Sequence, residues 1–348
     1  MSAVKKNIAV IGAGLAGLAC ARELGKGGHQ VCIFEKSRGA GGRLSTRWTD
    51  RDLNPPVGFD HGAQYIHARS PSFSALMEAA QAAGAAKVWN GRVVHLAYGV
   101  QSEEQPARSA RWVGVPGMTS LARFLAGDAD LQLQKKVTEV VRQGDTHTLK
   151  IVKTDGTVES RSGFDFVVSA IPAEQTAQLF SAKIDSLADV AMQVTSEVNW
   201  TVMVSFANRT PINFDGAFVA DSPLGWICRD SSKPGRAAGE RWVLQATSDW
   251  SSLHKDYPKE VVADLLMDVF MSLIGKQIEP LDLTAHRWLY GVPSNPLTDR
   301  FFVDMSASVA ACGDWLCGSS AESAFSSGEA LGQVLNRHFE AQLSGSSA

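Results

Sequence analysis

Apolar residues near the N-terminus form two short runs with a helix-like segment between them. Residues 7–11 (Asn-Ile-Ala-Val-Ile) and 30–34 (Gln-Val-Cys-Ile-Phe) are apolar and rich in β-branched side chains, as buried parallel strands are. Residues 18–25 consist of helix-forming side chains with one apolar face. This pattern predicts a strand, a helix and a second strand at the start of the chain.

Further along, the hydrophobic pattern alternates between strand and helix periods. Strands are predicted at residues 137–141, 148–153, 164–172, 200–206, 241–247, 285–290 and 308–312. Helices are predicted at residues 119–125, 259–274 and 322–343. The mixture of elements favours an α/β fold, and 348 residues are enough for two domains.

Composition narrows the class of protein. The chain is 45% hydrophobic and 20% charged, which is typical of a soluble globular protein. Its net charge of −3 does not indicate the positive surface that binding of nucleic acid requires. Five cysteines at irregular spacing do not resemble a secreted disulfide framework, so we expect a cytoplasmic protein. Cys312 and Cys317 lack nearby histidines or a second cysteine pair, so no metal site is expected.

The N-terminal apolar stretch could also be taken for a signal peptide. Lys5 and Lys6 precede the run at 8–21, which ends in an Ala-Cys-Ala step of the kind that is cleaved. Cleavage there would delete a glycine motif that the following strand needs, so we reject this interpretation. No segment approaches transmembrane length, and no membrane association is expected.

The glycine motif directly follows the first strand, in the sequence Gly12-Ala-Gly14-Leu-Ala-Gly17. In a βαβ unit, Gly12 makes the tight turn, Gly14 admits a pyrophosphate close to the backbone, and Gly17 lets helix and strand pack closely. The helix N-terminus favours the pyrophosphate anion. Glu35 at the end of the second strand can accept hydrogen bonds from ribose hydroxyls. These features predict a dinucleotide site.

The next segment resembles a flavoprotein signature. Glu35-Lys36 followed by Gly41-Gly42-Arg43 is similar to the E-x5-G-G-R motif of the family of FAD-dependent amine oxidases and protoporphyrinogen oxidases. Two adjacent glycines let the backbone pass close to the cofactor, and an arginine offers a fork of donors for the pyrophosphate. No second glycine fingerprint appears, as a second nucleotide would require. The resemblance implies non-covalently bound FAD.

Other segments carry the same resemblance along most of the chain. Residues 58–65 (Gly-Phe-Asp-His-Gly-Ala-Gln-Tyr) resemble the family segment beside the flavin ring, and Gly313-Asp314 resembles its Gly-Asp/Glu pair, whose acid binds a ribityl hydroxyl. The step at 318–321 (Gly-Ser-Ser-Ala) departs from the family's spacing. The resemblance implies cofactor contacts from Gly12, Ala13, Gly14, Ala16, Gly17, Glu35, Lys36, Gly42, Arg43, His61, Gly62, Ala63, Gln64, Val137, Asp314, Ser323 and Ala324.

The resemblance also implies an interleaved domain organisation. A Rossmann-like FAD-binding domain is expected from residues 1–72, 107–172 and 297–348. An α+β substrate domain, built on a mixed or antiparallel sheet, is expected from residues 73–106 and 173–296.

Within the family, the N-terminal segment, residues 58–65 and residues 286–291 (His-Arg-Trp-Leu-Tyr-Gly) most resemble the renalase group, in particular its bacterial form. This resemblance implies an oxidase of 2- and 6-dihydro isomers of NAD(P), which passes hydride to flavin N5 and then to O2, giving β-NAD(P)+ and H2O2. The candidate substrate-side residues are His61, Gln64, Tyr65, His286 and Trp288.

The residues themselves leave other functions open. A flavin amine oxidase or a desaturase of a small or apolar substrate would share every FAD motif, and a non-catalytic nucleotide-sensing flavoprotein would share the cofactor site. His61 could instead be a packed histidine that bonds a backbone carbonyl. Along a strand, His286 shares a face with Trp288 and Tyr290, and that face is the one favoured for the substrate.

Overall fold

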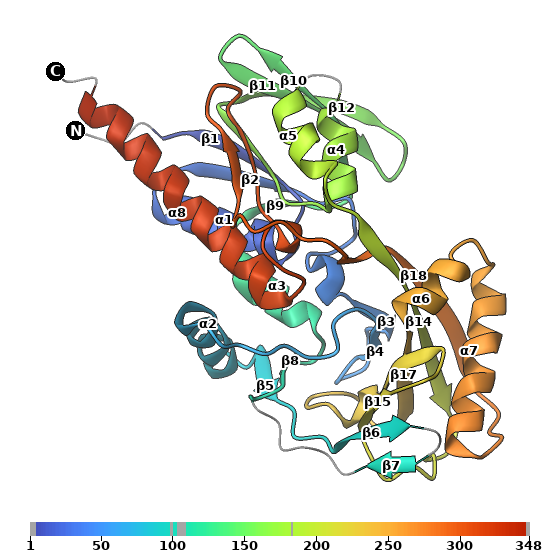
Figure 1. Ribbon diagram of the computed structural model, residues 1–348. Coiled ribbons are helices and arrows are strands. Elements are labelled where there is room, and N and C mark those ends of the chain that lie inside the picture. The colour runs from blue at the N-terminus through green and yellow to red at the C-terminus, as the bar shows by residue number, and fades with distance from the viewer. Residues whose placement is uncertain (1–4, 98–99, 103–108, 182–183, 346–348) are drawn as a thin grey trace. The chain divides into compact units, whose positions relative to one another are not determined.

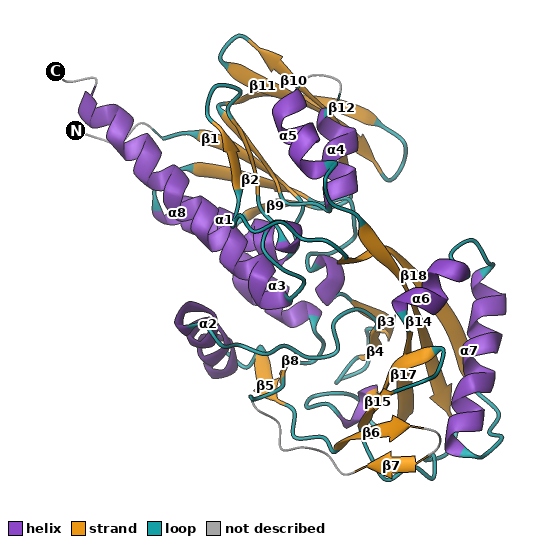
Figure 2. Ribbon diagram, viewed as in Figure 1, coloured by secondary structure: helices purple, strands orange, loops and turns teal. Residues whose placement is uncertain are grey.

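The computed structural model describes residues 5–97, 100–102, 109–181 and 184–345. The chain divides into two compact units, both made of segments distant in sequence (Figure 1). The first unit contains residues 1–42, 122–196 and 293–348, and the second contains residues 43–121 and 197–292. Both units mix helices and strands (Figure 2), so the fold is α/β as predicted.

The first unit is built on a six-stranded sheet in the order β19-β20-β13-β1-β2-β9. All neighbouring pairs in this sheet are parallel except β19 and β20. A parallel sheet with a glycine turn between β1 and the helix that follows it is the Rossmann arrangement. The strands are β1 (Asn7–Ile11), β2 (Gln30–Phe34), β9 (Asp130–Gln132), β13 (Phe166–Ser169), β19 (Phe302–Asp304) and β20 (Val309–Ala311).

The described residues of the first unit also form a three-stranded antiparallel sheet and several helices. The sheet contains β10 (Lys135–Gln143), β11 (Thr146–Lys153) and β12 (Val158–Phe164). The helices are α1 (Leu15–Lys26), α4 (Ala173–Phe180), α5 (Asp185–Ala191), the 3-10 turn η3 (Asp314–Leu316) and α8 (Ala321–Gly345). Side chains from both sheets and from α4 and α5 share one buried core, which includes Phe34, Leu149 and Phe180.

The second unit is built on a seven-stranded sheet in the order β18-β14-β17-β16-β15-β6-β7. Its strands are β6 (Val93–Ala97), β7 (Val100–Ser102), β14 (Ser196–Phe206), β15 (Gly216–Val219), β16 (Leu224–Arg229), β17 (Glu240–Ala246) and β18 (Asp282–Pro293). Two ribbons accompany it: β3 (Thr46–Asp50) with β4 (Val57–Asp60), and β5 (Ala86–Val88) with β8 (Trp112–Gly114).

Helices of the second unit include one that packs on the large sheet. Helix α7 (Lys259–Ile274) buries Leu266 and Phe270 against sheet residues such as Trp242, with which Phe270 makes a ring contact at 5.5 Å. The remaining helices are α2 (Pro71–Ala82), α6 (Ser248–Leu253) and the 3-10 turn η2 (Asp230–Ser232). Helix α3 (Thr119–Ala126) and the turn η1 (Gly42–Leu44) lie where the chain passes from one unit to the other.

The predicted elements agree with the structure in kind. The strand at 7–11 and the helix at 259–274 have the predicted bounds. The run at 164–172 is broken: β12 ends at Phe164 and β13 stops at Ser169, because β12 pairs with β11 whereas β13 pairs with β1. The strand predicted at 285–290 extends on both sides to residues 282–293.

The compact units differ from the predicted division into cofactor and substrate domains. Residues 43–72 and 109–121 pack with the second unit, and residues 173–181 and 184–196 pack with the first. The predicted boundary at residues 106 and 107 lies outside the described residues. The two units are defined by how the chain packs, whereas the predicted domains are defined by whether a segment binds FAD or substrate. Which segments bind FAD and which bind substrate therefore stays a prediction.

Helices α1 and α8 approach each other so closely that only glycine fits at the contact. A Cβ added to Gly328 on α8 would lie 2.0 Å from the backbone oxygen of Ala16 on α1. Backbone atoms of a helix cannot move away without breaking its own hydrogen bonds. The pair therefore fixes where the first turn of α1 lies against α8.

We predict that Gly328→Ala lowers the free energy of unfolding by about 1–3 kcal/mol, because the added methyl overpacks a backbone contact. Gly25→Ala on α1 is the matched control, since a Cβ there meets no atom within 4 Å and a helical glycine is destabilising relative to alanine by up to about 1 kcal/mol. Urea unfolding at saturating FAD measures both. Equal stability of the two variants would contradict the prediction.

Candidate functional site

The turn between β1 and α1 places three glycines with different roles. The N–H of Gly12 donates to the Phe34 carbonyl at 2.8 Å, and Gly12 has a φ of +107°. A Cβ on Gly17 would lie 2.0 Å from the Gly12 oxygen, so Gly12 and Gly17 are required by the fold itself. In contrast, a Cβ on Gly14 would meet no protein atom within 4 Å. Gly14 therefore borders open space at the start of α1.

Glu35 holds the same turn from the side of β2. Its side chain is only 6% exposed, and its Oε2 accepts a hydrogen bond from the Ala13 N–H at 2.9 Å. Its Oε1 accepts another from the N–H of Ser37 at 2.8 Å. Lys36 beside it is exposed. The predicted acid thus lies at the turn, and its carboxylate organises backbone donors there.

The second glycine pair closes onto the first motif. The N–H of Gly41 donates to the Ala13 oxygen at 2.8 Å, and a Cβ on Gly42 would approach the Gly14 Cα to 3.5 Å. Gly42 has a φ of +52°, which glycine adopts without strain. The two motifs, separated by more than twenty residues, therefore form one backbone-lined site in the first unit.

The other predicted cofactor residues of the first unit lie on four separate elements. Ala16 is buried on α1, Val137 is buried on β10, and Asp314 is 4% exposed in η3. Ser323 and Ala324 belong to the first turn of α8, where their N–H groups donate to the Oγ and the carbonyl of Ser320. Their role in holding cofactor stays a prediction.

In the second unit, Arg43 and the loop after β4 pack together. A Cβ on Gly62 would lie 2.0 Å from the Arg43 oxygen, and the N–H of Ala63 donates to that oxygen at 2.9 Å. The Arg43 guanidinium donates to the carbonyl of Gly291 on β18 at 3.1 Å. The residue expected to bind a pyrophosphate therefore also joins this loop to β18.

Three predicted substrate-side residues form one aromatic cluster. The His61 ring lies 4.8 Å from that of His286 and 5.0 Å from that of Trp288, and the last two are 4.6 Å apart. The Trp288 Nε1–H donates to the His61 carbonyl at 2.8 Å. His286 and Trp288 thus share a face of β18, as the strand period predicted. We call these three residues the histidine–tryptophan cluster.

Both imidazoles of this cluster are held neutral. Burial, followed by the charges of His286 and Arg47, lowers the pKa of His61 to about 3. Burial and then Arg47 also lower the pKa of His286. The Nδ1 atom of His61 is buried without a hydrogen-bond partner among the described residues. The ring also hydrogen-bonds the backbone of Ser45. A neutral imidazole can donate or accept a hydrogen bond, so the hydrogen-bonding capacity of Nδ1 is unused by the described residues.

The loop that carries His61 is anchored by buried charges that the sequence did not reveal. Lys233 is fully buried, and its Nζ lies 2.7 Å from Asp230 and 3.3 Å from Asp60, while Arg236 pairs with Asp60 as well. Burial alone would raise the pKa of Asp60, but the charges of Arg236 and Lys233 outweigh it and hold that pKa below its usual range. Lys233 and Arg236 stand in a Ser/Pro/Gly-rich loop with no periodic signal, so the sequence could not distinguish them from solvated charges.

Gln64 and Tyr65 lie outside the histidine–tryptophan cluster. The Gln64 amide donates to the backbone oxygens of Asp60 and Gly62 and accepts from Lys233 at 3.3 Å. The Tyr65 ring contacts Trp226 at 5.6 Å and Trp89 at 6.3 Å instead. Gln64 therefore shapes the loop, and substrate contact by these two residues stays a prediction.

Two further observations bear on the kind of site. Among the described residues, no group of three or more histidine, cysteine, aspartate or glutamate side chains could hold a metal ion. Within the same part of the chain, no helix is both long and apolar enough to cross a bilayer.

Comparisons with known proteins agree with this arrangement. The family model described as flavin-containing amine oxidoreductase matches residues 95–330, and that of NAD(P)-binding Rossmann-like domains matches residues 10–80. A putative protoporphyrinogen oxidase from Exiguobacterium has a similar fold, with a TM-score of 0.75, 14% identity, and coverage of 97% of this chain and 100% of that one. A putrescine oxidase triple mutant with redesigned cofactor binding has a TM-score of 0.66 at 11% identity, covering 97% and 99%.

Curated relatives match over short stretches only. A D-amino acid dehydrogenase of Helicobacter pylori is 54% identical over 39 residues, which are 11% of this chain and 10% of that protein. A 4,4'-diapophytoene desaturase of Staphylococcus haemolyticus is 60% identical over 53 residues, 14% and 11% of the two chains. The matches thus span about a tenth of these relatives' lengths. Together with the family model and the putrescine oxidase fold, they support FAD as the cofactor.

The first unit fits this cofactor on structural grounds. The open space at Gly14, the N-terminus of α1 and the close approach of Gly42 form a cradle lined by backbone, which suits a pyrophosphate. The carboxylate of Glu35 lies at its edge, where it can accept hydrogen bonds from a ribose. FAD supplies a two-electron acceptor when it is bound there.

We predict that Gly14→Ala and Gly17→Ala fail in different ways. At Gly14 the added methyl meets no protein atom, so the apoprotein should lose at most about 1 kcal/mol through the weaker N-cap, yet retain much less FAD because the methyl occupies the cradle. At Gly17 the methyl meets the Gly12 backbone, so the fold itself should be destabilised. The ratio of flavin to protein absorbance and urea unfolding of the apoprotein separate the two effects. Normal FAD content in Gly14→Ala would contradict the proposed cradle.

We also predict that His61 makes stability depend on pH. The folded protein keeps His61 neutral down to about pH 3, but the unfolded chain takes up a proton near pH 6.5. Stability must therefore fall as the pH drops below 6.5, by about 2 kcal/mol at pH 5 from this group. The substitution His61→Gln should remove this pH dependence. The difference in free energy of unfolding between variant and wild type should therefore change by about 2 kcal/mol between pH 8 and pH 5. Parallel stability curves would contradict the prediction.

Proposed function

The chain belongs to the family of flavin-containing amine oxidoreductases, and from this premise we propose that it is an FAD-dependent oxidase of the 2- and 6-dihydro isomers of NAD(P). The proposal follows the resemblance to the renalase group. One observation supports it above the others: two neutral histidines and a tryptophan meet in one cluster, in which the Nδ1 of His61 bonds no described residue.

The proposed reaction balances as an oxidation by O2. The dihydronicotinamide loses a hydride, and together with one proton from solvent this hydride reduces O2 to H2O2 by way of the bound flavin, leaving β-NAD(P)+. Loss of hydride makes the nicotinamide ring aromatic, so no general base is obligatory. Orientation of the ring can then supply most of the acceleration.

The cluster suits the charge that develops in such a step. The nicotinamide ring becomes cationic as it loses hydride, and protonated histidines beside it would oppose that change. His61 and His286 are neutral at physiological pH because of burial and Arg47. The face of Trp288 favours a developing cation. The Nδ1 of His61, which bonds no described residue, is the nitrogen proposed to bond the carboxamide.

Two other functions stay as alternatives. A flavin amine oxidase or a desaturase of a small or apolar substrate is compatible with the family and with the short match to the desaturase. A nucleotide-sensing flavoprotein without turnover would need the same FAD cradle. The polar character of the histidine–tryptophan cluster favours a substrate with hydrogen-bonding groups over an apolar one.

We predict that 6-dihydro-NAD(P) or its 2-dihydro isomer bleaches the visible flavin band when mixed anaerobically with the holoenzyme in a stopped-flow instrument. One β-NAD(P)+ should form per flavin, and under air one H2O2 per substrate. Ordinary NAD(P)H, which is the 4-dihydro isomer, and a set of primary and secondary amines are the control substrates.

His286→Phe should slow flavin reduction at saturating substrate about tenfold or more, because a phenyl ring of similar size has no ring nitrogen with which to hydrogen-bond the substrate. Exposed His95, on β6, supplies the matched control His95→Phe. Flavin reduction by an amine and by neither dihydronicotinamide isomer would establish the amine oxidase alternative. Reduction by none of the compounds would favour the sensor.

A further inference from the structure

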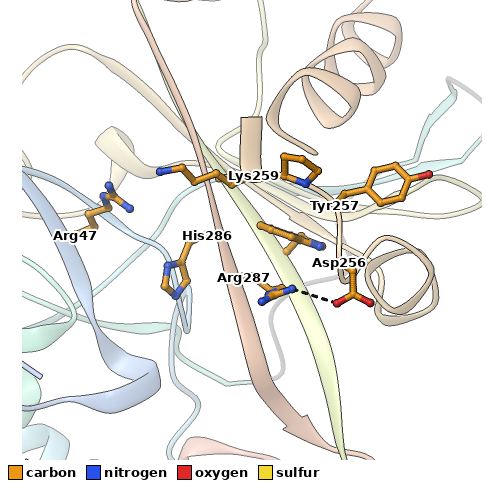
Figure 3. A pocket seen from close by; sticks show the side chains of 9 residues that line it. Arg47, Asp256, Tyr257, Lys259, His286 and Arg287 are labelled. Carbon is orange, nitrogen blue, oxygen red and sulfur yellow. Dashed lines mark ion pairs between the residues drawn. The ribbon is translucent and has the colours of Figure 1, made fainter. Parts of the chain in front are cut away.

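A polar cleft of about 580 Å³ opens beside the histidine–tryptophan cluster, within the second unit (Figure 3). Its volume is that of a site for a small-molecule ligand. It is lined by Arg47, Trp200, Asp256, Tyr257, Pro258, Lys259, Ala285, His286 and Arg287. His286 belongs both to this cleft and to the cluster, so the two are adjacent.

The cleft contains more positive than negative charge. Three cationic side chains, Arg47, Lys259 and Arg287, line it together with one carboxylate, Asp256. Arg287 is already engaged: it lies 3.7 Å from Asp256, donates to the Lys255 carbonyl and covers the Trp200 ring at 5.8 Å. Asp256, the carboxylate of the lining, thus pairs with Arg287, and no ion pair joins it to Arg47 or Lys259 among the described residues.

These two cations line the same cleft. In the view of Figure 3 the Lys259 side chain extends toward the side of the cleft where Arg47 is drawn, and His286 lines the same cleft. Among the described residues, Lys259 has one ion-pair partner, its exposed sequence neighbour Glu260 at 3.7 Å, and a pair of that kind contributes little. An anion bound in the cleft would be attracted by both cations at once. An ammonium and a planar guanidinium together match a phosphate.

The charge of Arg47 also reaches the cluster, where it lowers the pKa of His286 and of His61. A ligand whose ring lies at the cluster can therefore place an attached anion next to Arg47. The dinucleotide substrate proposed above has this layout, because a pyrophosphate follows its nicotinamide ribose.

We propose that Arg47 and Lys259 form the phosphate-binding subsite for the dinucleotide substrate. The identity of the substrate rests on the proposed function. The binding of an anion by these residues rests on the charges that line the cleft. In this arrangement the cations hold the pyrophosphate and thereby orient the dihydronicotinamide at His61, His286 and Trp288. The bound phosphate also offsets the positive charge of Arg47 near a ring that becomes cationic.

The first arm of the test uses turnover. Steady-state kinetics of the holoenzyme compare 6-dihydro-NAD with a 6-dihydro-N-alkylnicotinamide that has no phosphate. Arg47→Gln and Lys259→Gln should each lower the ratio of kcat/KM for the dinucleotide to that for the phosphate-free compound by about five- to tenfold, mainly through KM. Arg51→Gln and Lys276→Gln are matched controls, since both residues are exposed and neither lines the cleft.

The second arm does not need turnover. ADP-ribose and inorganic pyrophosphate are titrated separately into the holoenzyme, with calorimetry for affinity and the His286 imidazole NMR signals for location. Binding should shift the His286 signals and weaken in Arg47→Gln and Lys259→Gln but not in the two controls. Tighter binding of ADP-ribose than of pyrophosphate supports a nucleotide site.

The outcomes separate the two proposals. If neither dihydronicotinamide isomer is oxidised but ADP-ribose binding depends on Arg47 and Lys259, the proposed function is wrong and the phosphate subsite stands. If the isomers are oxidised and the kcat/KM ratio does not change in the variants, the subsite is wrong and the function stands. Binding of pyrophosphate alone, without ADP-ribose binding or an effect on the ratio, shows a site for free anions and also overturns the subsite.

Discussion

Much of the structure depends on close contacts between backbone segments that leave no room for a Cβ atom. The turn after β1 folds against α1 because Gly17 has no Cβ to meet the Gly12 oxygen, and α1 packs on α8 because Gly328 has none to meet the Ala16 oxygen. These contacts fix the start of α1. The carboxylate of Glu35 and the backbone at Gly41 and Gly42 then bond to or pack against that start. The cradle for a pyrophosphate is a consequence of this packing.

The second unit uses a different constraint, a buried set of charges. Asp60, Asp230, Lys233 and Arg236 are removed from solvent, and a buried ion left without its partner would be very unfavourable. The four residues therefore have to stay together, and Asp60 brings the following loop with it. That loop carries His61, whose ring meets His286 and Trp288 from β18. This ion network thus positions the cluster proposed to bind the nicotinamide.

Burial and charge act together on the chemistry of this cluster. Desolvation keeps both imidazoles neutral, and Arg47 adds to the effect. The same arginine lines the cleft with Lys259 and Arg287, so cations outnumber the one carboxylate there, Asp256. A dinucleotide would satisfy both regions at once, its ring at the neutral cluster and its phosphates at the cations. Substrate preference in this chain would then come from electrostatics as much as from shape.

The sequence alone determined the elements whose causes are local. The strands at 7–11 and 30–34, the helix at 259–274 and the glycine motif with Glu35 follow from periodicity and from the backbone conformations that glycine allows. The shared face of His286 and Trp288 follows from the period of a strand. Tertiary structure decided the rest, because it depends on contacts between distant residues. The burial of Lys233 and Arg236, the separation of Tyr65 from His61, and the cleft shared by Arg47 and Lys259 arise only when the sheet brings these segments together. A charged residue in a loop looks the same in sequence whether water or a carboxylate surrounds it.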